Sequence, residues 1–426
     1  MSFMKKVFAI TLVLLALCLV FISCSGDNQT DETQEIETTP IKELDEPVLS
    51  DTVTATPIVY GEAFCDTYTY AVYGLCENSS EITYSVDGQN EYSEVFEDGT
   101  FFIFTYVRKD SEEISLRAVA NGKEESETVT LKIDRTLDTS AKNAVIGKNG
   151  HLHIEASLSD FTTRNKFKTG RLHEIKSYLE GYAQSVKTVS PDTELIIFIS
   201  PNKATVYPET LPDDVVKRTN GISRLEQMEE LFKDNESVTL LTPRDYLIEK
   251  KADGTILYNK TDTHWNELGA YYASEYLLNY MSSDFPETKI IPLDSYVIEK
   301  KNVAGGDLMN SFGIDLSIGQ ERPGVFVRGY KDSVFTFKKP YAMNFLNEGT
   351  QDEQSYSTGK EELPTVVMYR DSFSSNMMMY LADSLESIYF RPMWTYGPEL
   401  DFIEQTKPDY VVIEIVERCM TDIFGG

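Results

Sequence analysis

The segment Pro364-Thr-Val-Val-Met-Tyr-Arg-Asp-Ser372 is the clearest indication of the fold of the larger part of this chain. Its apolar run is typical of a buried strand, and the polar residues at its end mark a turn before a predicted helix. A strand that passes directly into a helix is the repeating unit of an α/β fold, which carries its chemistry at such turns. Ser372 lies at this turn, close to the free backbone N–H groups of the predicted helix, which are ready donors for an oxyanion.

Strands and helices alternate on both sides of this segment. The predicted strands are 194–200, 237–241, 365–369, 387–390 and 410–415, and the predicted helices are 168–189, 221–233, 266–281, 374–385 and 399–406. This alternation predicts a parallel sheet with helices on both faces, spanning residues 140–426. Residues from about 290 to 362 follow no regular pattern, so we expect an insertion there.

The N-terminus has the pattern of a targeting segment. Two lysines precede an unbroken apolar stretch at residues 7–22, which ends at Ser23-Cys24. This pattern predicts a lipoprotein signal peptide over residues 1–23, with Cys24 as the lipidated N-terminus, although Phe21 replaces the usual Leu. An uncleaved signal anchor is the alternative, but the stretch is shorter than the roughly 20 residues that span a bilayer. In both cases we expect an extracytoplasmic protein, and the first predicts a lipid anchor in the cell membrane.

Two further regions separate this segment from the α/β part. Residues 24–46 are acidic and polar, so they are predicted to form a disordered tether. Residues 47–137 contain six segments rich in β-branched and aromatic residues, with Asp-Gly and Asn-Gly turns between them: 52–60, 68–75, 81–86, 100–107, 114–120 and 128–133. They predict a small all-β sandwich, immunoglobulin-like in strand number, that serves as a spacer or binding module. Cys65 and Cys76 can pair in an oxidising compartment, but no sequence feature defines their geometry.

The composition excludes several classes of function. The formal net charge of −30 argues against nucleic acid as a partner, because its phosphates need a basic surface. It also disfavours binding to an anionic membrane surface through charge. The five cysteines form no zinc-type cluster with histidine, so we predict neither a metal site nor a cofactor.

Asp262, His264 and Ser372 offer the carboxylate, imidazole and hydroxyl that acyl transfer through serine needs. A serine hydroxyl is a poor nucleophile until an imidazole takes its proton and a carboxylate orients that imidazole. The chain has only four histidines, which limits the choice of base. Each segment also has an ordinary explanation. Asp262 can be an N-cap residue beside a surface histidine, and Asp371, Ser372 or Ser374 can cap the helix that follows the strand. An Asp/His pair also binds divalent metals, but no convincing third and fourth ligands are present.

The segment Asp262-Thr-His-Trp-Asn-Glu-Leu-Gly-Ala270 resembles the signature of the SGNH-type alginate O-acetyltransferase and DHHW families. Further similar segments are 147–153, 201–212, Asp371-Ser372, and 407–412 leading into Glu417-Arg418. The resemblance covers about residues 140–426, and the order of Asp and His before Ser is that of the permuted SGNH members. It favours the triad over the separate structural explanations.

The resemblance implies an SGNH-hydrolase-like fold with Ser372 as nucleophile, His264 as base and Asp262 as the group that orients the base. It implies an esterase or O-acetyltransferase that moves acetyl groups onto or off a polysaccharide through an acyl-serine, with a membrane acyl-donor protein as a candidate partner. The N–H of Ser372 is one expected oxyanion donor. The second is unassigned because no Gly-x-Asn-Asp block is present, and Asn202 is a candidate. Arg370 stands where the family usually has Gly.

Two classes of function remain open at this point. The first is a cell-envelope enzyme, and the second is a non-catalytic lipoprotein that binds glycan or protein partners through an SGNH-like scaffold. The intact triad favours the enzyme, because a binding scaffold has no need of all three roles. The sequence does not separate hydrolase from transferase, since both share the acyl-enzyme, and it does not identify the glycan.

Overall fold

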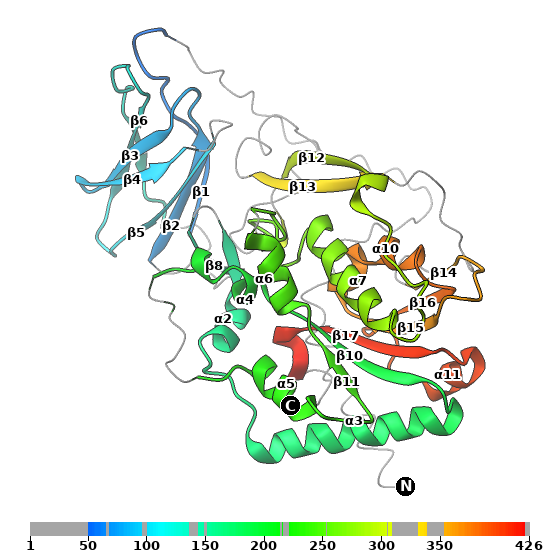
Figure 1. Cartoon of the computed structure of the whole chain (residues 1–426). Helices are drawn as coiled ribbons and strands as arrows, with labels where there is room; N and C mark the ends of the chain where they lie inside the picture. The colour runs from blue at the N-terminus through cyan, green and yellow to red at the C-terminus, as the bar shows by residue number, and fades with distance from the viewer. Residues whose placement is uncertain are drawn as a thin grey trace, which may run out of the picture. The chain divides into compact units, whose positions relative to one another are not determined.

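The computed structural model describes residues 50–64, 68–95, 100–135, 144–148, 151–213, 215, 221–252, 254–304, 306–308, 331–338 and 353–421 (Figure 1). The predicted signal peptide, Cys24 and the tether lie outside the described residues, as do parts of the predicted insertion. Within the described part of the chain, no helix combines the length and the apolar character needed to cross a bilayer.

The N-terminal part is built from two antiparallel sheets with strand orders β1-β2-β5 and β4-β3-β6-β7. Side chains of both sheets share one core, which includes Ile103 of the first sheet and Ile82 and Leu116 of the second. The predicted small all-β module is therefore confirmed. Its strands are β1 (Ile58–Phe64), β2 (Thr69–Leu75), β3 (Glu81–Val86), β4 (Gln89–Glu94), β5 (Thr100–Tyr106), β6 (Glu113–Val119) and β7 (Val129–Lys132).

Strand β4 was absent from the prediction because its sequence, Gln-Asn-Glu-Tyr-Ser-Glu, is almost entirely polar. The turn before it explains why it forms. Asp87 and Gly88 both have positive φ, at 49° and 86°, which is the backbone that a two-residue hairpin turn requires. This turn folds β4 back onto β3 in antiparallel register.

Cys76 carries a free, buried thiol that donates a hydrogen bond to the Ala55 carbonyl oxygen at 3.3 Å. Burial raises the pKa of this thiol to about 11, so it stays protonated. Cys65 lies outside the described residues. Pairing of Cys65 with Cys76 therefore gains no support.

The C-terminal part is a six-stranded sheet with the order β11-β10-β17-β15-β16-β14. Five strands are parallel, and β14 pairs antiparallel with β16 at one edge. The predicted parallel sheet is confirmed, while β14 was hidden in the stretch interpreted as an insertion. The strands are β10 (Glu194–Ser200), β11 (Thr239–Leu241), β14 (Gln354–Ser357), β15 (Thr365–Arg370), β16 (Ser387–Pro392) and β17 (Tyr410–Val416).

Helices cover both faces of this sheet. Successive side chains along each strand point to opposite faces, so one strand contributes to two cores. Phe198 packs in one core with α7 and α10, whereas Ile197 packs in the other with α3, α5 and α11. Figure 1 shows α3 and α7 on opposite sides of the sheet. The helices are α2 (Glu155–Phe161), α3 (Thr169–Val189), α4 (Lys203–Val206), α5 (Arg224–Phe232), α6 (Arg244–Ala252), α7 (Glu267–Met281), α10 (Met378–Ala382) and α11 (Leu400–Thr406).

The helix predicted at 374–385 differs from the structure. A 3₁₀ helix, η5 (Ser372–Asn376), comes first, and α10 then makes little more than one turn. The cause is the run Ser372-Phe-Ser-Ser-Asn376, since Ser and Asn compete with the helix for backbone hydrogen bonds.

The remaining elements in the described part of the chain are two antiparallel strand pairs and three other short 3₁₀ helices. The hairpin of β12 and β13 lies in the predicted insertion. These elements are β8 (Ala144–Ile146), β9 (Leu152–Ile154), β12 (Val297–Ala304), β13 (Lys331–Lys338), η2 (Pro208–Thr210), η3 (Leu293–Ser295) and η6 (Glu417–Cys419).

Candidate active site

Ser372 is exposed at the first position of η5, directly after β15. Asp371 caps this helix, because its Oδ1 accepts a hydrogen bond from the Phe373 N–H at 2.8 Å. The other carboxylate oxygen of Asp371 accepts from the Val416 N–H at 2.7 Å, which ties the turn to β17. The capping role suggested by the sequence therefore belongs to Asp371. It leaves the hydroxyl of Ser372 available for other contacts.

Asp262, His264 and Ser372 form one hydrogen-bonded chain. The Ser372 Oγ lies 2.8 Å from His264 Nε2, and the Asp262 Oδ1 lies 2.8 Å from His264 Nδ1. The same Oδ1 accepts from the His264 backbone N–H at 2.8 Å. A carboxylate can only accept, so Nδ1 carries the proton and the Nε2 lone pair faces the serine hydroxyl. The structure thus brings the three predicted residues together in the order that general-base activation of serine requires.

The electrostatics suit His264 to this task. Burial lowers the pKa of His264, but the hydrogen bond to Asp262 and the charges of Asp262 and Asp307 outweigh it. The net effect raises the pKa of His264, with a small opposing effect from the charge of Arg418. Burial alone would raise the pKa of Asp262, yet contacts with His264 hold it well below its usual range. Asp262 therefore stays ionised beside the imidazole.

Lys203 anchors the loop that carries Asp262. Its buried ammonium donates to the carbonyl oxygens of Asn259, Lys260 and Asp262 at 3.0, 2.9 and 2.6 Å. The sequence showed Lys203 only as part of a segment similar to a family loop, and gave it no role. Its three acceptors show that it fixes the backbone of this loop.

Trp265 joins the loop of His264 to the turn of Ser372. Its indole Nε1 donates to the Phe373 carbonyl oxygen at 2.8 Å, and the two rings pack edge to face with centroids 5.2 Å apart. Trp265 is fully buried. The His264 ring itself lies 4.8 Å from the ring of Phe373. These contacts set the distance between base and nucleophile.

Asp307 is a second carboxylate beside His264, and sequence reasoning missed it. Its Oδ1 accepts from the Thr263 N–H at 2.8 Å, and its Oδ2 lies 3.7 Å from His264 Nδ1. Asp262, His264 and Asp307 offer ligand atoms within 4.8 Å of one another, close enough to hold a metal ion. Both ring nitrogens of His264 are already hydrogen-bonded, however, so a metal would have to displace Asp262 or Ser372. The hydrogen bonds favour proton transfer over metal binding.

Asn202 follows β10 at the same end of the sheet, where Ser200 pairs with Val416. Its Oδ1 accepts from Arg418 Nη1 at 3.3 Å, and its buried Nδ2 has no acceptor among the described residues. A guanidinium only donates, so the amide atom that faces Arg418 must be the oxygen. Asn202 thus presents a free donor at this edge. No hydrogen bond within the described chain joins it to Ser372, because β17 lies between their strands.

A family model described as "SGNH hydrolase-like domain, acetyltransferase AlgX" matches residues 159–388, more than half of the chain. The chain belongs to this AlgX-type SGNH hydrolase-like family. All three triad residues lie within the matched range.

Several solved structures are similar to this family member. They include a DHHW family protein from Eubacterium siraeum (15% identity, 66% of this chain and 95% of that chain, TM-score 0.45). A second is Bacillus cereus PatB1 with a sulfonyl adduct (13% identity, 66% of this chain and 99% of that chain, TM-score 0.48). A third is the O-acetyltransferase domain of Pseudomonas putida AlgJ (17% identity, 65% of this chain and 92% of that chain, TM-score 0.42). All three TM-scores lie below 0.5. No curated protein matches the chain.

Arg370, at the position where the sequence resemblance led us to expect Gly, is buried and supports the serine turn of this AlgX-type domain. Its Nη1 donates to the Asp371 carbonyl oxygen and to Ser375 Oγ, each at 3.2 Å. Its guanidinium also lies 5.0 Å from the centre of the Trp394 ring. The substitution therefore leaves the site assembled.

The other three histidines make no contact with the triad in the described structure. His173 is exposed on α3. His153 is buried in β9 with its Nε2 3.0 Å from Thr210 Oγ1, and burial lowers its pKa to about 2. Burial likewise lowers the pKa of His151 to about 3. Both are structural residues that stay neutral.

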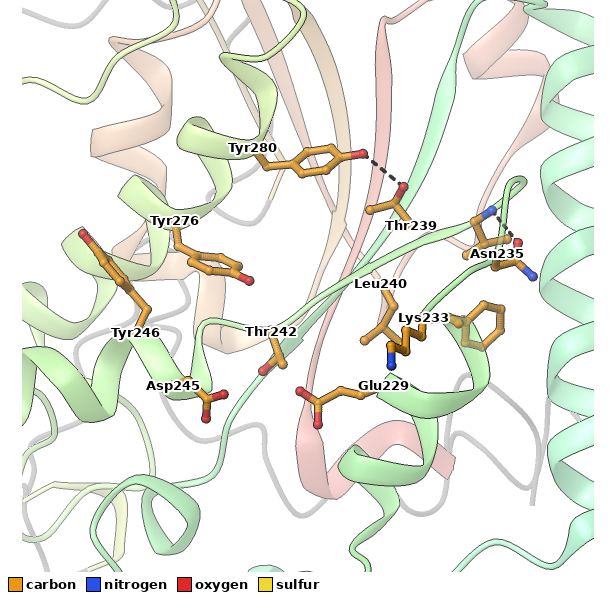
Figure 2. Close-up of a pocket in the computed structure, with 12 residues that line it drawn as sticks. Glu229, Lys233, Asn235, Thr239, Leu240, Thr242, Asp245, Tyr246, Tyr276 and Tyr280 are labelled. Carbon is orange, nitrogen blue, oxygen red and sulfur yellow. Dashed lines mark hydrogen bonds between the residues drawn. The ribbon is translucent and has the colours of Figure 1, made fainter.

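A cavity of about 350 Å³ lies elsewhere in this AlgX-type domain, along β11 (Figure 2). Several polar groups in it are already paired: Glu229 accepts from Arg244 at 2.7 Å, and the hydroxyls of Thr239 and Tyr280 lie 3.1 Å apart. The described residues that line it include no His, Ser or Cys. The cavity therefore lacks a nucleophile and base of the triad type, and the triad is the candidate active site.

Proposed function

We propose that this chain is a serine-dependent esterase or O-acetyltransferase that acts on acetyl groups of a cell-envelope or extracellular polysaccharide. One observation carries the proposal: the continuous chain from Asp262 through His264 to an exposed Ser372, with both hydrogen bonds at 2.8 Å. Membership of the SGNH hydrolase-like acetyltransferase family supports the same chemistry. A scaffold used only for binding has no need of a base aligned with a nucleophile.

Acylation follows from the geometry. Ser372 Oγ attacks the acetyl carbonyl carbon while His264 Nε2 takes the hydroxyl proton, and Asp262 stabilises the resulting imidazolium. The oxyanion that forms accepts hydrogen bonds from the Ser372 N–H, a helix-terminal donor, and in this proposal from Asn202 Nδ2. When the tetrahedral intermediate collapses, the leaving alcohol takes the proton from Nε2. Acetyl-Ser372 remains.

Deacylation decides between the two reactions. Water or a sugar hydroxyl attacks acetyl-Ser372, and His264 again takes the proton of the attacking group. Attack by water makes the protein an esterase, and attack by a glycan hydroxyl makes it a transferase. In the transferase direction, a membrane partner would present the acetyl group to Ser372.

The proposed place of action is the outer side of the cell membrane. The supporting observation is the sequence pattern of residues 1–24, in which a basic start and an apolar stretch lead to Ser23-Cys24. A lipid on Cys24 would hold the enzyme at the cell envelope, where polysaccharide and a membrane-bound acyl donor are both within reach.

A fluorophosphonate probe tests the nucleophile, because it forms a covalent bond with an activated serine. We expect labelling of the wild-type protein at Ser372 and none of the Ser372→Ala variant. Ser375→Ala is the matched control, since Ser375 is an exposed serine of the same 3₁₀ helix, and it should label normally. Acetyl release and acetyl transfer are then measured with acetylated and unacetylated polysaccharides. A folded wild-type protein that takes up no label would refute the enzyme and favour the non-catalytic binding lipoprotein.

A further inference from the structure

We propose that Asp307 is a positioning residue of the triad, acting on His264 through Thr263. In this arrangement two carboxylates orient one imidazole. Asp262 is hydrogen-bonded to the ring directly, and Asp307 acts on it through the hydroxyl of Thr263. The inference rests on the proposed function, because the imidazolium that Asp307 stabilises forms when Ser372 is acylated.

The backbone around Asp307 is fastened to the segment that carries Asp262. Three successive N–H groups donate to this segment: Gly306 to Thr261 Oγ1 at 2.6 Å, Asp307 to Asp262 Oδ2 at 3.3 Å, and Leu308 to the Thr261 carbonyl oxygen at 3.0 Å. The approach is so close that a Cβ at position 306 would lie 2.5 Å from the Cβ of Asp262. Only glycine permits this contact. These backbone contacts therefore fix Asp307 next to Asp262.

The side chain of Asp307 reaches His264 by a relay. Thr263 Oγ1 donates its only proton to Asp307 Oδ2 at 2.6 Å. An oxygen lone pair of Thr263 can therefore face His264 Nδ1, which lies 3.3 Å away. The Nδ1–H then has a second acceptor beside Asp262. Removing either carboxylate would leave the ring less firmly held.

The charge of Asp307 also acts on the ring. The groups that face His264 are the carboxylates of Asp262 and Asp307, which raise its pKa, and the guanidinium of Arg418, which lowers it. Burial of the ring is the largest effect that lowers the pKa. Removal of one of the two negative charges should therefore make the imidazole less basic.

The first experiment measures the pKa of His264 without any substrate. The ring protons of ¹³C-labelled histidine are titrated by NMR, and the His264→Ala variant identifies the signal among the four histidines. We expect Asp307→Asn to lower the pKa of His264 by about one unit, the lower end of the effect of a charge at this distance. Asp192→Asn, at an exposed position, is the matched control and should leave the pKa unchanged.

The second experiment measures the pH profile of kcat/KM with an acetyl ester. In Asp307→Asn the acid limb should move to lower pH, and the plateau should fall by up to about tenfold, as one unit of lost imidazolium stabilisation implies. In Asp307→Glu, which keeps the charge, the acid limb and the plateau should each return part of the way to their wild-type values. A purely structural role would lower the plateau without moving the limb. If Asp307→Asn does not fold, Thr263→Val, which removes only the relay, should lower the pKa by a smaller amount.

The outcomes separate this inference from the proposed function. An unchanged pKa of His264 in Asp307→Asn would overturn the inference even if the wild type is an active esterase. A lowered pKa in a protein that turns over no ester would leave the positioning role intact while the proposed function fails.

Discussion

Replacement of Trp265 by Phe tests whether the contact between the two site segments controls both stability and chemistry. Trp265 is fully buried and is the only side chain of the loop around His264 that both packs on and hydrogen-bonds to Phe373, within the described structure. Phe keeps one aromatic ring in place but removes the indole N–H and the second ring.

The expected loss of stability has two parts. The hydrogen bond to the Phe373 carbonyl contributes about 0.5–1.5 kcal/mol net. Truncation of the buried ring system costs about 1–2 kcal/mol of apolar burial. The sum is a decrease of about 1.5–3.5 kcal/mol in the free energy of unfolding, a large share of a typical domain stability of about 5–15 kcal/mol.

Chemical denaturation followed by circular dichroism measures this loss, and the rate of ester hydrolysis by the folded variant measures the effect on the site. We expect the rate to fall by tenfold or more, because a shift of about 1 Å between nucleophile and base can cost about 100-fold. The other tryptophan supplies the control: Trp394 is 50% exposed, so Trp394→Phe should cost under about 1 kcal/mol. If Trp265→Phe behaves like this control in both assays, Trp265 does not set the geometry of the site.

Three further results are expected. With para-nitrophenyl acetate as substrate, Ser372→Ala and His264→Ala should each abolish nearly all activity, and the double mutant should be little worse. Asp262→Ala should lower the activity less. A wild-type rate in Ser372→Ala would contradict the assignment of the nucleophile. Because His264 must be neutral to act as base and its pKa is raised, kcat/KM should already decline as the pH falls toward the ordinary histidine value of 6.5, and a pH–rate profile that stays flat well below 6.5 would count against this. Replacement of Cys24 by Ala should move the protein from the membrane fraction to the soluble fraction, whereas full retention in the membrane through residues 7–22 would replace the lipid anchor by a signal anchor.

The triad could be predicted from sequence because its three chemical groups occur in short, recognisable segments. Asp262 and His264 are two residues apart, and Ser372 follows a strand that its apolar pattern reveals. Asp307 could not be predicted, since it lies 45 residues beyond Asp262 in an irregular stretch and is one of 69 acidic residues. Only the contacts of Gly306 and Asp307 with residues 261–263 distinguish it, and those exist only in the folded chain.

The same contrast holds for the fold. Strands β10 and β15 are buried on both faces, so their sequences are continuous apolar runs that predict them almost residue for residue. Among the described strands, the edge strands β4 and β14 each pair with one neighbouring strand. Their sequences are polar, so they could not be recognised. In both cases the strand forms by pairing with a neighbouring strand, and the local sequence contains no pattern that predicts this pairing.

The position of β17 makes assembly of the site depend on a strand late in the described chain. This strand follows all the other described strands in the chain, yet it lies in the middle of the sheet between β10 and β15. Until residues 410–416 are added, the halves that carry Asn202 and Ser372 have no shared strand to align them. A chain in which this strand has not yet entered the sheet therefore contains all three triad residues without the strand that joins the two halves of the site. Insertion of β17 is thus the step of folding that aligns these halves.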